Sequence, residues 1–407
     1  MRRIQLFQEG GWLDLLTEAH GAAEAGHRPE RTLTEAAENH ERKVEKAHNL
    51  VHMGELSAAR RVLVSDGLAP GTPETLQQLR ARPVQPYQEL KQSVMEFQPP
   101  VSITLSKSSL HSNLKRARRG AAPGPSGCTA EHLKVLLDDE GTLELFTYAA
   151  ERLAQARVPG CVVDGLRLGR LVALRKPNGK VRGIVAGDVF RRMVARTIAQ
   201  QLAPVFTEAC SPFQYAVSTR AGTECVAHAI RAVTERRPTA TIVSIDGVGA
   251  FDHVSRQAML GNLMGLPHGA AASPFVRMFY GSPSTYLWHD QDGHPHEVTQ
   301  AEGGEQGDHM MPGLFALGQH PALAEVQSSL QHDEAVFAFL DDIYIICEPD
   351  RVVFLFRLVQ EALWTHARIE VNLCKTKVGN AGGVEPAGVR EIGGSEADPV
   401  WVGGQNL

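Results

Sequence analysis

Two adjacent aspartates, Asp341 and Asp342, lie between two strongly apolar runs of the chain. The runs, Ala335 to Leu340 and Ile343 to Ile346, are rich in β-branched and aromatic residues and predict two buried strands joined by a tight turn. A carboxylate in such a place needs an opposite charge or a metal ion, because burial of an unpaired charge is costly. The pair therefore predicts a site for a divalent cation, which prefers hard oxygen ligands.

A third carboxylate, Asp246, follows the β-branched run Thr241 to Ile245. If this run and those around Asp341 form neighbouring strands, the carboxylates lie at one edge of a sheet and could share two Mg²⁺ ions, as in polymerases and nucleases. Taken alone, Asp246 is better explained as a cap at the end of a strand. The dipeptide Asp138-Asp139 carries no such prediction, because the polar end of a helix fits an exposed surface.

The charge of the chain is unevenly distributed. Its 407 residues carry 41 Lys+Arg and 46 Asp+Glu, a net charge of -5. Residues 107–200 nevertheless hold 17 basic against 8 acidic side chains. Such a block is typical of a solvated surface, and it is also typical of a channel that binds the phosphates of a nucleic acid.

The composition excludes several classes of protein. A hydrophobic fraction of 43% is enough for a packed core and excludes a disordered chain. The six cysteines form no CxxC pair, so neither a zinc knuckle nor a disulfide framework is indicated. The sequence has no run of about 18 uncharged apolar residues and no signal peptide. We therefore expect a soluble intracellular protein, nuclear or cytoplasmic, without a membrane partner.

Periodicity divides the chain into four regions. We expect a helical leader with a proline-rich linker at 1–100, a basic region at 101–238, a strand-rich region at 239–378 and a glycine-rich, loosely ordered tail at 379–407. The basic region contains a strand pattern from Gly169 to Arg175, followed by a turn. The alternation of strand and helix patterns in the third region predicts a sheet covered by helices, in an α/β or α+β fold.

Six short segments follow one another in an order and at intervals that are typical of one known family. They are Ala122 to Gly127, Lys176 to Ile184, Asp246 to Val254, Gly303 to Pro312, Phe339 to Asp342, and Asn372 to Lys377. Together these segments resemble the motifs of reverse transcriptases, and the closest likeness is to the non-LTR (LINE-type) retrotransposon branch. The likeness spans about two thirds of the chain.

The resemblance implies an α+β fold, with the palm and fingers of a right-hand polymerase. The palm would be an antiparallel sheet backed by helices, preceded by the helical leader, and the thumb would be missing or truncated. The implied activity is RNA-directed DNA synthesis, in which dNTPs extend a DNA primer on an RNA template. Two alternatives are an RNA-dependent RNA polymerase and an inactive retroelement fragment that only binds nucleic acid.

The resemblance also assigns the carboxylates and the glycines that follow the first of them. Asp246 and Asp341 would bridge two Mg²⁺ ions, for which Mn²⁺ is an alternative, and Asp342 would support the site. Gly247 and Gly249 would let the backbone approach the triphosphate, because a Cβ at either position would intrude.

Further substrate contacts are implied around the carboxylates. Phe251 matches the family's aromatic gate, which excludes a 2′-hydroxyl; a plain core aromatic is an equally good explanation of its spacing. Gln306 and Gly307 resemble the pair that touches the incoming nucleotide and the template. Lys176 and Arg182 would bind the β- and γ-phosphates from the fingers.

Lys375 would order the triphosphate or protonate pyrophosphate, although a surface lysine after a strand explains the residue as well. Three positions depart from the family pattern. Leu340 replaces a common alanine, and His309 and Gly183 each replace a proline. These departures are compatible with ordinary drift and with an inactivated relic.

Overall fold

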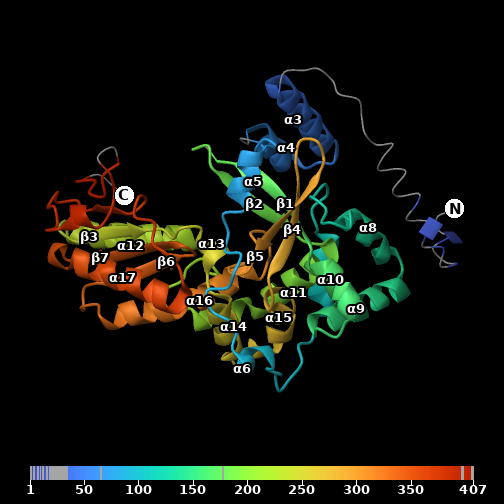
Figure 1. Cartoon of the computed structure of the whole chain (residues 1–407). Helices are drawn as coiled ribbons and strands as arrows, with labels where there is room; N and C mark the ends of the chain where they lie inside the picture. The colour runs from blue at the N-terminus through green and yellow to red at the C-terminus, as the bar shows by residue number, and fades with distance from the viewer. Residues whose placement is uncertain are drawn as a thin grey trace. The chain divides into compact units, whose positions relative to one another are not determined.

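The computed structural model describes residues 2, 5, 6, 9, 11, 13, 14 and 17, and residues 35–404 apart from 65, 66, 177, 396 and 397. The chain divides into two compact units, Met1–Gly67 and Leu68–Leu407, and Figure 1 shows their helices and strands. In the first unit, α3 (Glu35–His52) and α4 (Leu56–Val64) pack together through Ala47, Leu50 and Ala59. The part of the predicted leader before residue 35 lies largely outside the described residues.

The second unit contains two sheets, and the first has the strand order β2-β1-β4-β5. Its strands are β1 (Gly169–Arg175), β2 (Val181–Ala186), β4 (Ser284–His289) and β5 (Pro295–Gln300). Strand β1 pairs antiparallel with β2 and parallel with β4. The predicted bounds of β1 are confirmed, because its apolar side chains alternate and bury one face. Strands β4 and β5 come from the region at 239–378, which was predicted to be rich in strands.

The second sheet has the order β6-β7-β3-β8, and all its neighbours are antiparallel. Its strands are β3 (Thr241–Ile245), β6 (Ala335–Phe339), β7 (Asp342–Cys347) and β8 (Lys377–Gly379). The predicted strands before Asp246 and on both sides of Asp341 are thus confirmed. Ile245 lies opposite Ile343, so the chain leaving β3 and the turn between β6 and β7 lie at the same edge of the sheet.

Long apolar helices back this second sheet. Helix α16 (Met311–Ser328) and helix α17 (Val352–Ala367) pack against each other, and they contact β6 and β3 respectively. Helix α14 (Arg256–Met264) packs on α16, and α12 (Gly222–Arg236) contacts β6. Most residues of α16 are buried, because the helix is apolar nearly all round. The predicted antiparallel sheet backed by helices is confirmed.

The basic region is mainly helical. Helix α11 (Val189–Ala209) packs against α7 (Lys107–Lys115) and α9 (Glu140–Ala154), and their apolar faces join the main core. The remaining α-helices of the second unit are α5 (Pro73–Leu79), α6 (Gln92–Met95), α8 (Ala130–Lys134), α10 (Gly160–Arg167), α13 (Ala250–His253) and α15 (Ser273–Tyr280).

Residues 68–100 run along the first sheet. The amide of Ala69 donates to the carbonyl of Ala173 (2.9 Å), and the amide of Ala301 donates to the carbonyl of Pro83 (2.7 Å). Helix α5 packs on β2, where Leu79 joins a small core with Leu171 and Val185. This segment therefore belongs to the second unit, and the expected boundaries between leader, fingers and palm stay predictions.

The tail differs from the loosely ordered segment that its glycines suggest. Val389, Ile392 and Val400 are buried in the main core. The amide of Val378 donates to the carbonyl of Val400 (2.8 Å), and the amide of Val402 donates back to Val378 (2.9 Å). The expectation of disorder was wrong for these residues, because spaced apolar side chains and backbone pairing outweigh the glycine content. In the described part of the chain, no helix has the length and apolarity needed to cross a membrane.

Candidate active site

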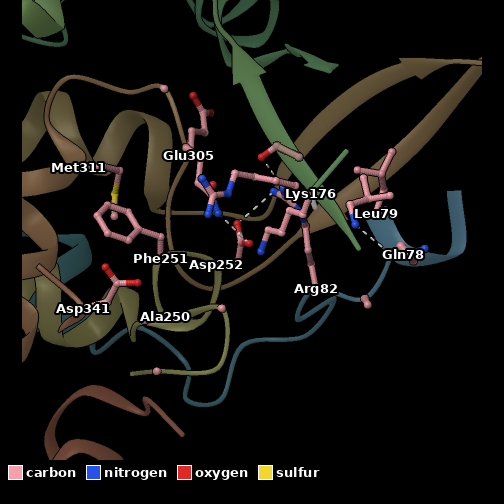
Figure 2. A pocket seen from close by; sticks show the side chains of 18 of the residues that line it. Gln78, Leu79, Arg82, Lys176, Ala250, Phe251, Asp252, Glu305, Met311 and Asp341 are labelled. Atoms are coloured by element: carbon pink, nitrogen blue, oxygen red, sulfur yellow. Dashed lines mark hydrogen bonds and ion pairs between the residues drawn. The ribbon is translucent and has the colours of Figure 1, made fainter. Parts of the chain in front are cut away.

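An open cavity of about 470 Å³ is lined by residues of β2 and by the loops that follow β3 and β6, and Figure 2 shows the side chains around it. The sequence-predicted site residues lie on its wall, with the exception of Asp342. They are Lys176, Arg182, Asp246, Gly247, Gly249, Phe251, Gln306, Gly307, Asp341 and Lys375. Residues that are far apart in the sequence therefore meet at one cavity.

The carboxylates of the second sheet act on one another. Asp246 follows β3, and Asp341 lies in the turn between β6 and β7. Burial raises the pKa of Asp341, and the charge of Asp246 raises it further. Burial also raises the pKa of Asp342, as do the charges of Asp341 and Asp246. Asp246 and Asp341 at the cavity, with the charge of Asp342 nearby, offer oxygen ligands of the kind that divalent cations prefer.

Asp342 has a different exposure from the other two aspartates. It is solvent-exposed, and it borders a second cavity together with Tyr344 and Lys377. Asp342 and Tyr344 lie two residues apart on β7, so their side chains point to the same face of the sheet, which borders the second cavity. Asp342 therefore influences the first cavity by its charge and does not form part of the wall.

Cationic side chains line the same cavity as the carboxylates. The ammonium of Lys375 forms an ion pair with Asp246. Burial lowers the pKa of Lys176, and the positive charges of Arg182, Lys375 and Lys180 lower it further. The mutual repulsion of these cations indicates a place for an anion.

Phe251 belongs to the core and to the cavity at the same time. Its ring stacks on that of Phe315 in α16, with centroids 4.6 Å apart and an angle of 3° between the planes. The same side chain lines the cavity beside Asp341 (Figure 2). Both explanations of its spacing are therefore compatible with its position, and the gate stays a prediction.

The backbone between Asp246 and Phe251 requires its glycines. Gly249 has a φ of +54°, a left-handed conformation that residues with a Cβ adopt at a cost. A Cβ on Gly247 would lie 2.8 Å from Cβ of Ala250 and 2.9 Å from Cγ2 of Ile369. The tight turn brings the backbone to the cavity wall, as the proposed approach to a triphosphate needs.

Residues 174–393 match the profile of the family described as Reverse transcriptase (RNA-dependent DNA polymerase). This match covers more than half of the chain. The chain belongs to the reverse transcriptase family. It is 26% identical over 251 residues to the retrotransposable element SLACS 132 kDa protein of Trypanosoma brucei gambiense. The family and the non-LTR resemblance predicted from the motifs are confirmed.

The matched region covers 61% of this chain and 21% of the trypanosome protein, so the chain spans about a fifth of that relative. Among solved structures, apo telomerase from Candida tropicalis, truncated from its C-terminal domain, is similar with a TM-score of 0.41 and 11% identity. That similarity covers 52% of this chain and 50% of the telomerase chain.

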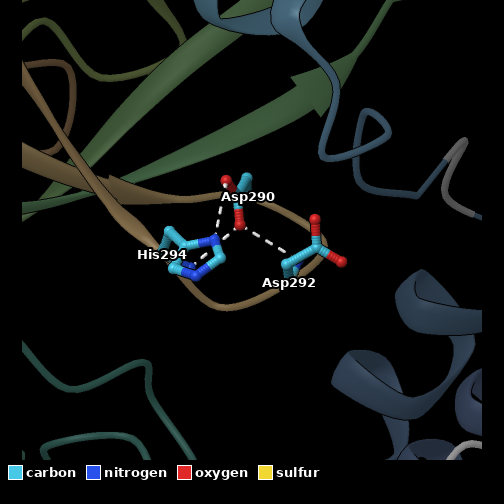
Figure 3. Close-up of side chains that lie close together, drawn as sticks. All are labelled: Asp290, Asp292 and His294. Carbon is cyan, nitrogen blue, oxygen red and sulfur yellow. Dashed lines mark hydrogen bonds and ion pairs between the residues drawn. The ribbon is translucent and has the colours of Figure 1, made fainter.

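Reverse transcriptases generally use divalent metal ions. A group of side chains that could hold a metal ion also lies outside the cavity described above. Among the described residues, Asp290, Asp292 and His294 bring their ligand atoms within 4.8 Å of one another (Figure 3). Asp290 accepts hydrogen bonds from the amides of Asp292 (3.0 Å) and His294 (2.9 Å). A hydrogen bond with His296 is the main cause that lowers the pKa of Asp290 to about 2. These bonds explain the cluster as the turn between β4 and β5.

Gln214 was not predicted from the sequence, and it forms hydrogen bonds with the turn that contains Asp341. Leu340, the residue before Asp341, has a φ of +55°. Its amide donates to Oε1 of Gln214 (2.7 Å), and Nε2 of Gln214 donates to its carbonyl (3.4 Å). Gln214 is buried, and its Nε2 also donates to Oε1 of Gln319 in α16 (3.3 Å). This role is visible only in the folded structure, because 126 residues separate Gln214 from Leu340 in the sequence.

A buried ionic network supports the loop that carries Gln306. The guanidinium of Arg191 pairs with Glu305 (2.9 Å) and with Asp308 (3.5 Å). The hydroxyl of Tyr280 donates to the same Asp308 oxygen that Arg191 contacts (2.6 Å). Both flanks of the loop are thus fixed from α11 and α15, which limits the positions that Gln306 can adopt.

Proposed function

We propose that this chain is an RNA-directed DNA polymerase of a retrotransposon. It extends the 3′ end of a DNA primer on an RNA template, inside the cell. The observation that carries this proposal is the meeting of carboxylates, cations and Phe251 on one cavity in a reverse transcriptase chain.

In the proposed reaction, the primer 3′-oxygen attacks the α-phosphorus of a dNTP and pyrophosphate leaves. Asp246 and Asp341 would hold two divalent ions, Mg²⁺ with Mn²⁺ as a substitute, and Asp342 adds to the negative potential. When bound, such ions would lower the pKa of the 3′-hydroxyl and offset the charge of the triphosphate. Lys176 and Arg182 bind the β- and γ-phosphates, so that the leaving group stays oriented.

The other cavity residues place the sugar and base. Gly247 and Gly249 allow close approach of the backbone to the triphosphate. Phe251 excludes a 2′-hydroxyl, while Gln306 and Gly307 contact the nucleotide and the template. Lys375, which pairs with Asp246, orders the triphosphate or protonates the departing pyrophosphate.

Primer extension on poly(rA)/oligo(dT) with Mg²⁺ tests the proposal, with dTTP compared with UTP. Incorporation of dTTP alone is the expected result. Incorporation of UTP in its place would identify an RNA-dependent RNA polymerase. Binding of the template without any extension, with Mg²⁺ or Mn²⁺, would identify an inactive nucleic-acid-binding fragment.

Lys176→Ala is expected to raise the KM for dTTP by about tenfold, because one charge-assisted contact to the triphosphate is lost. The Kd for the primer–template is expected to stay unchanged. Lys180→Ala is the matched control, since Lys180 lies in the same turn and does not line the cavity. A changed Kd with an unchanged KM would assign Lys176 to the nucleic acid instead.

An exposed basic cluster of α7 and the loop after it is expected to contact the nucleic-acid backbone. It consists of Lys115, Arg116, Arg118 and Arg119. Arg118→Ala should reduce the slope of log K against log salt by about one unit, because one phosphate contact releases about one counterion. Arg390→Ala, which removes an exposed arginine paired with Glu385, should leave the slope unchanged. Equal slopes for all three proteins would remove the cluster from the interface.

Gln214→Ala is expected to lower kcat by about tenfold or more, because the turn before Asp341 loses its support. The second substitution Leu340→Gly should restore much of this loss, since glycine adopts a positive φ without strain. Asn113→Ala is the control, because Asn113 donates a buried hydrogen bond to Thr197 (3.1 Å) far from that turn. Absence of any rescue in the double variant would show that Gln214 does not act through Leu340.

A further inference from the structure

Arg82 reaches the cavity from a part of the chain that the family profile does not cover. The residue follows α5, and its side chain is 4% exposed. Together with Gln78 and Leu79 it lines the cavity on the side opposite Asp341 (Figure 2). The family match begins at residue 174, so nothing in that match assigns these residues to the site.

The guanidinium of Arg82 joins three elements. It pairs with Oδ1 of Asp252 in α13 (3.4 Å) and donates to the carbonyl of Gly183 in β2 (3.2 Å). It also donates to the side chain of Gln300, at the end of β5. One buried side chain thus connects the first sheet to the helical turn that follows Asp246.

Gly183 leaves the room that this guanidinium occupies. A Cβ at this position would lie 2.4 Å from Nη2 of Arg82, closer than real Cβ atoms approach a nitrogen. The next neighbours, Leu171 and Leu79, would lie at 3.1 Å. The buried arginine therefore gives a structural reason for a glycine at this position.

Asp252 contacts both Arg82 and Gln306 and so links the two side chains. Its Oδ2 accepts a hydrogen bond from Nε2 of Gln306 (3.1 Å). Burial raises the pKa of Asp252, and the charge of Arg82 is the largest influence that lowers it. Without Arg82, the buried carboxylate of Asp252 would lose its ion-pair partner, and its hydrogen bond with Gln306 would be less well held.

We propose that Arg82 is a positioning residue of the nucleotide site. Its guanidinium fills the space beside Gly183 that a side chain would otherwise occupy, and from there it holds Gln306 in position through Asp252. The inference rests on the proposed function, because Gln306 contacts the incoming nucleotide there. It adds the segment around Arg82 to the fingers side of the substrate pocket.

Binding of dTTP to the full chain on a primer–template tests this proposal. A primer that ends in a dideoxynucleotide blocks the chemistry, so the Kd for dTTP is measured without turnover. Arg82→Ala should raise this Kd about tenfold and leave the Kd for primer–template within about twofold. Arg82→Lys should recover part of the loss, because an ammonium still pairs with Asp252. Arg80→Ala is the matched control, since Arg80 is exposed and donates to the carbonyl of Glu297 (3.2 Å).

Gly183→Ala provides a second route that keeps the charge of Arg82. It should raise the Kd for dTTP in the natural background by displacing the guanidinium, and it should have little further effect in the Arg82→Ala background. Equal effects of Gly183→Ala in both backgrounds would overturn the proposal. So would an Arg82→Ala protein that binds dTTP normally, or one that loses primer–template binding to the same degree.

The urea midpoints of four proteins separate this inference from the proposed function. The four are the natural chain, Arg82→Ala, Gly183→Ala and the double variant. The unfolding cycle needs no activity, and it should show that Arg82 and Gly183 are coupled. A chain that binds dTTP but never extends a primer would refute the polymerase and leave the Arg82 result standing. Additive midpoints would refute the Arg82–Gly183 contact whatever the activity.

Discussion

Asp341→Asn is expected to abolish primer extension, with a fall in kcat of about 10³-fold or more, because a neutral amide would hold divalent cations far more weakly than a carboxylate. The fold should survive the change. In metal-free buffer at pH 7, the variant should unfold at the same temperature as the natural chain or higher.

The pKa of Asp341 gives the sign of this stability effect. Burial and the charge of Asp246 raise the pKa in the folded chain above its ordinary 3.8. The folded state therefore favours the protonated form of Asp341. The stability that this group contributes below pH 3.8 is lost as the pH rises through its pKa in the folded chain. At pH 7 the ionised group destabilises the metal-free fold, and an uncharged asparagine removes that repulsion.

Thermal unfolding with and without Mg²⁺ checks this expectation alongside the extension assay. Mg²⁺ should raise the Tm of the natural chain and have a smaller effect on the variant. Asp138→Asn is the matched control, since Asp138 is exposed in the second Asp-Asp pair. Normal extension by Asp341→Asn would exclude this aspartate as a metal ligand.

Phe251→Val is expected to admit ribonucleotides and to reduce the preference for dTTP over UTP by roughly 100-fold. The ring is held in place by its stack on Phe315, so it presents a rigid wall to the cavity. Valine opens the space in which a 2′-hydroxyl would lie. The ratio of kcat/KM for dTTP and UTP is the measurement.

Phe275→Val separates the gate from a general loss of packing. Phe275 is buried, contacts Phe279 edge-on, and does not line the cavity. Both variants should lose stability by about 1–3 kcal/mol, because each leaves a void in the core. Only Phe251→Val should change the nucleotide preference. Equal preference in the two variants would make Phe251 a core residue and nothing more.

The sequence by itself determined three strands of the second sheet and the candidate residues around them. The strands at Gly169–Arg175 and Thr241–Ile245 have the predicted bounds, because runs of apolar and β-branched side chains fit a buried strand and little else. Asp341 could be found for the same reason, since a carboxylate between two such runs requires an explanation, whereas Asp246 needed the spacing of the motifs as well. The spacing of the motifs then identified the family.

The tertiary structure alone decided how that site is held together. Arg82 lies 101 residues from Gly183, and Gln214 lies 126 residues from Leu340, so no local pattern announces either contact. Val400 is likewise buried by pairing with Val378 across the tail, where glycine content had suggested disorder. Periodicity reports which face of an element is apolar. It carries no information about which distant polar side chain will lie beside a turn or beside a glycine, because that depends on packing in three dimensions.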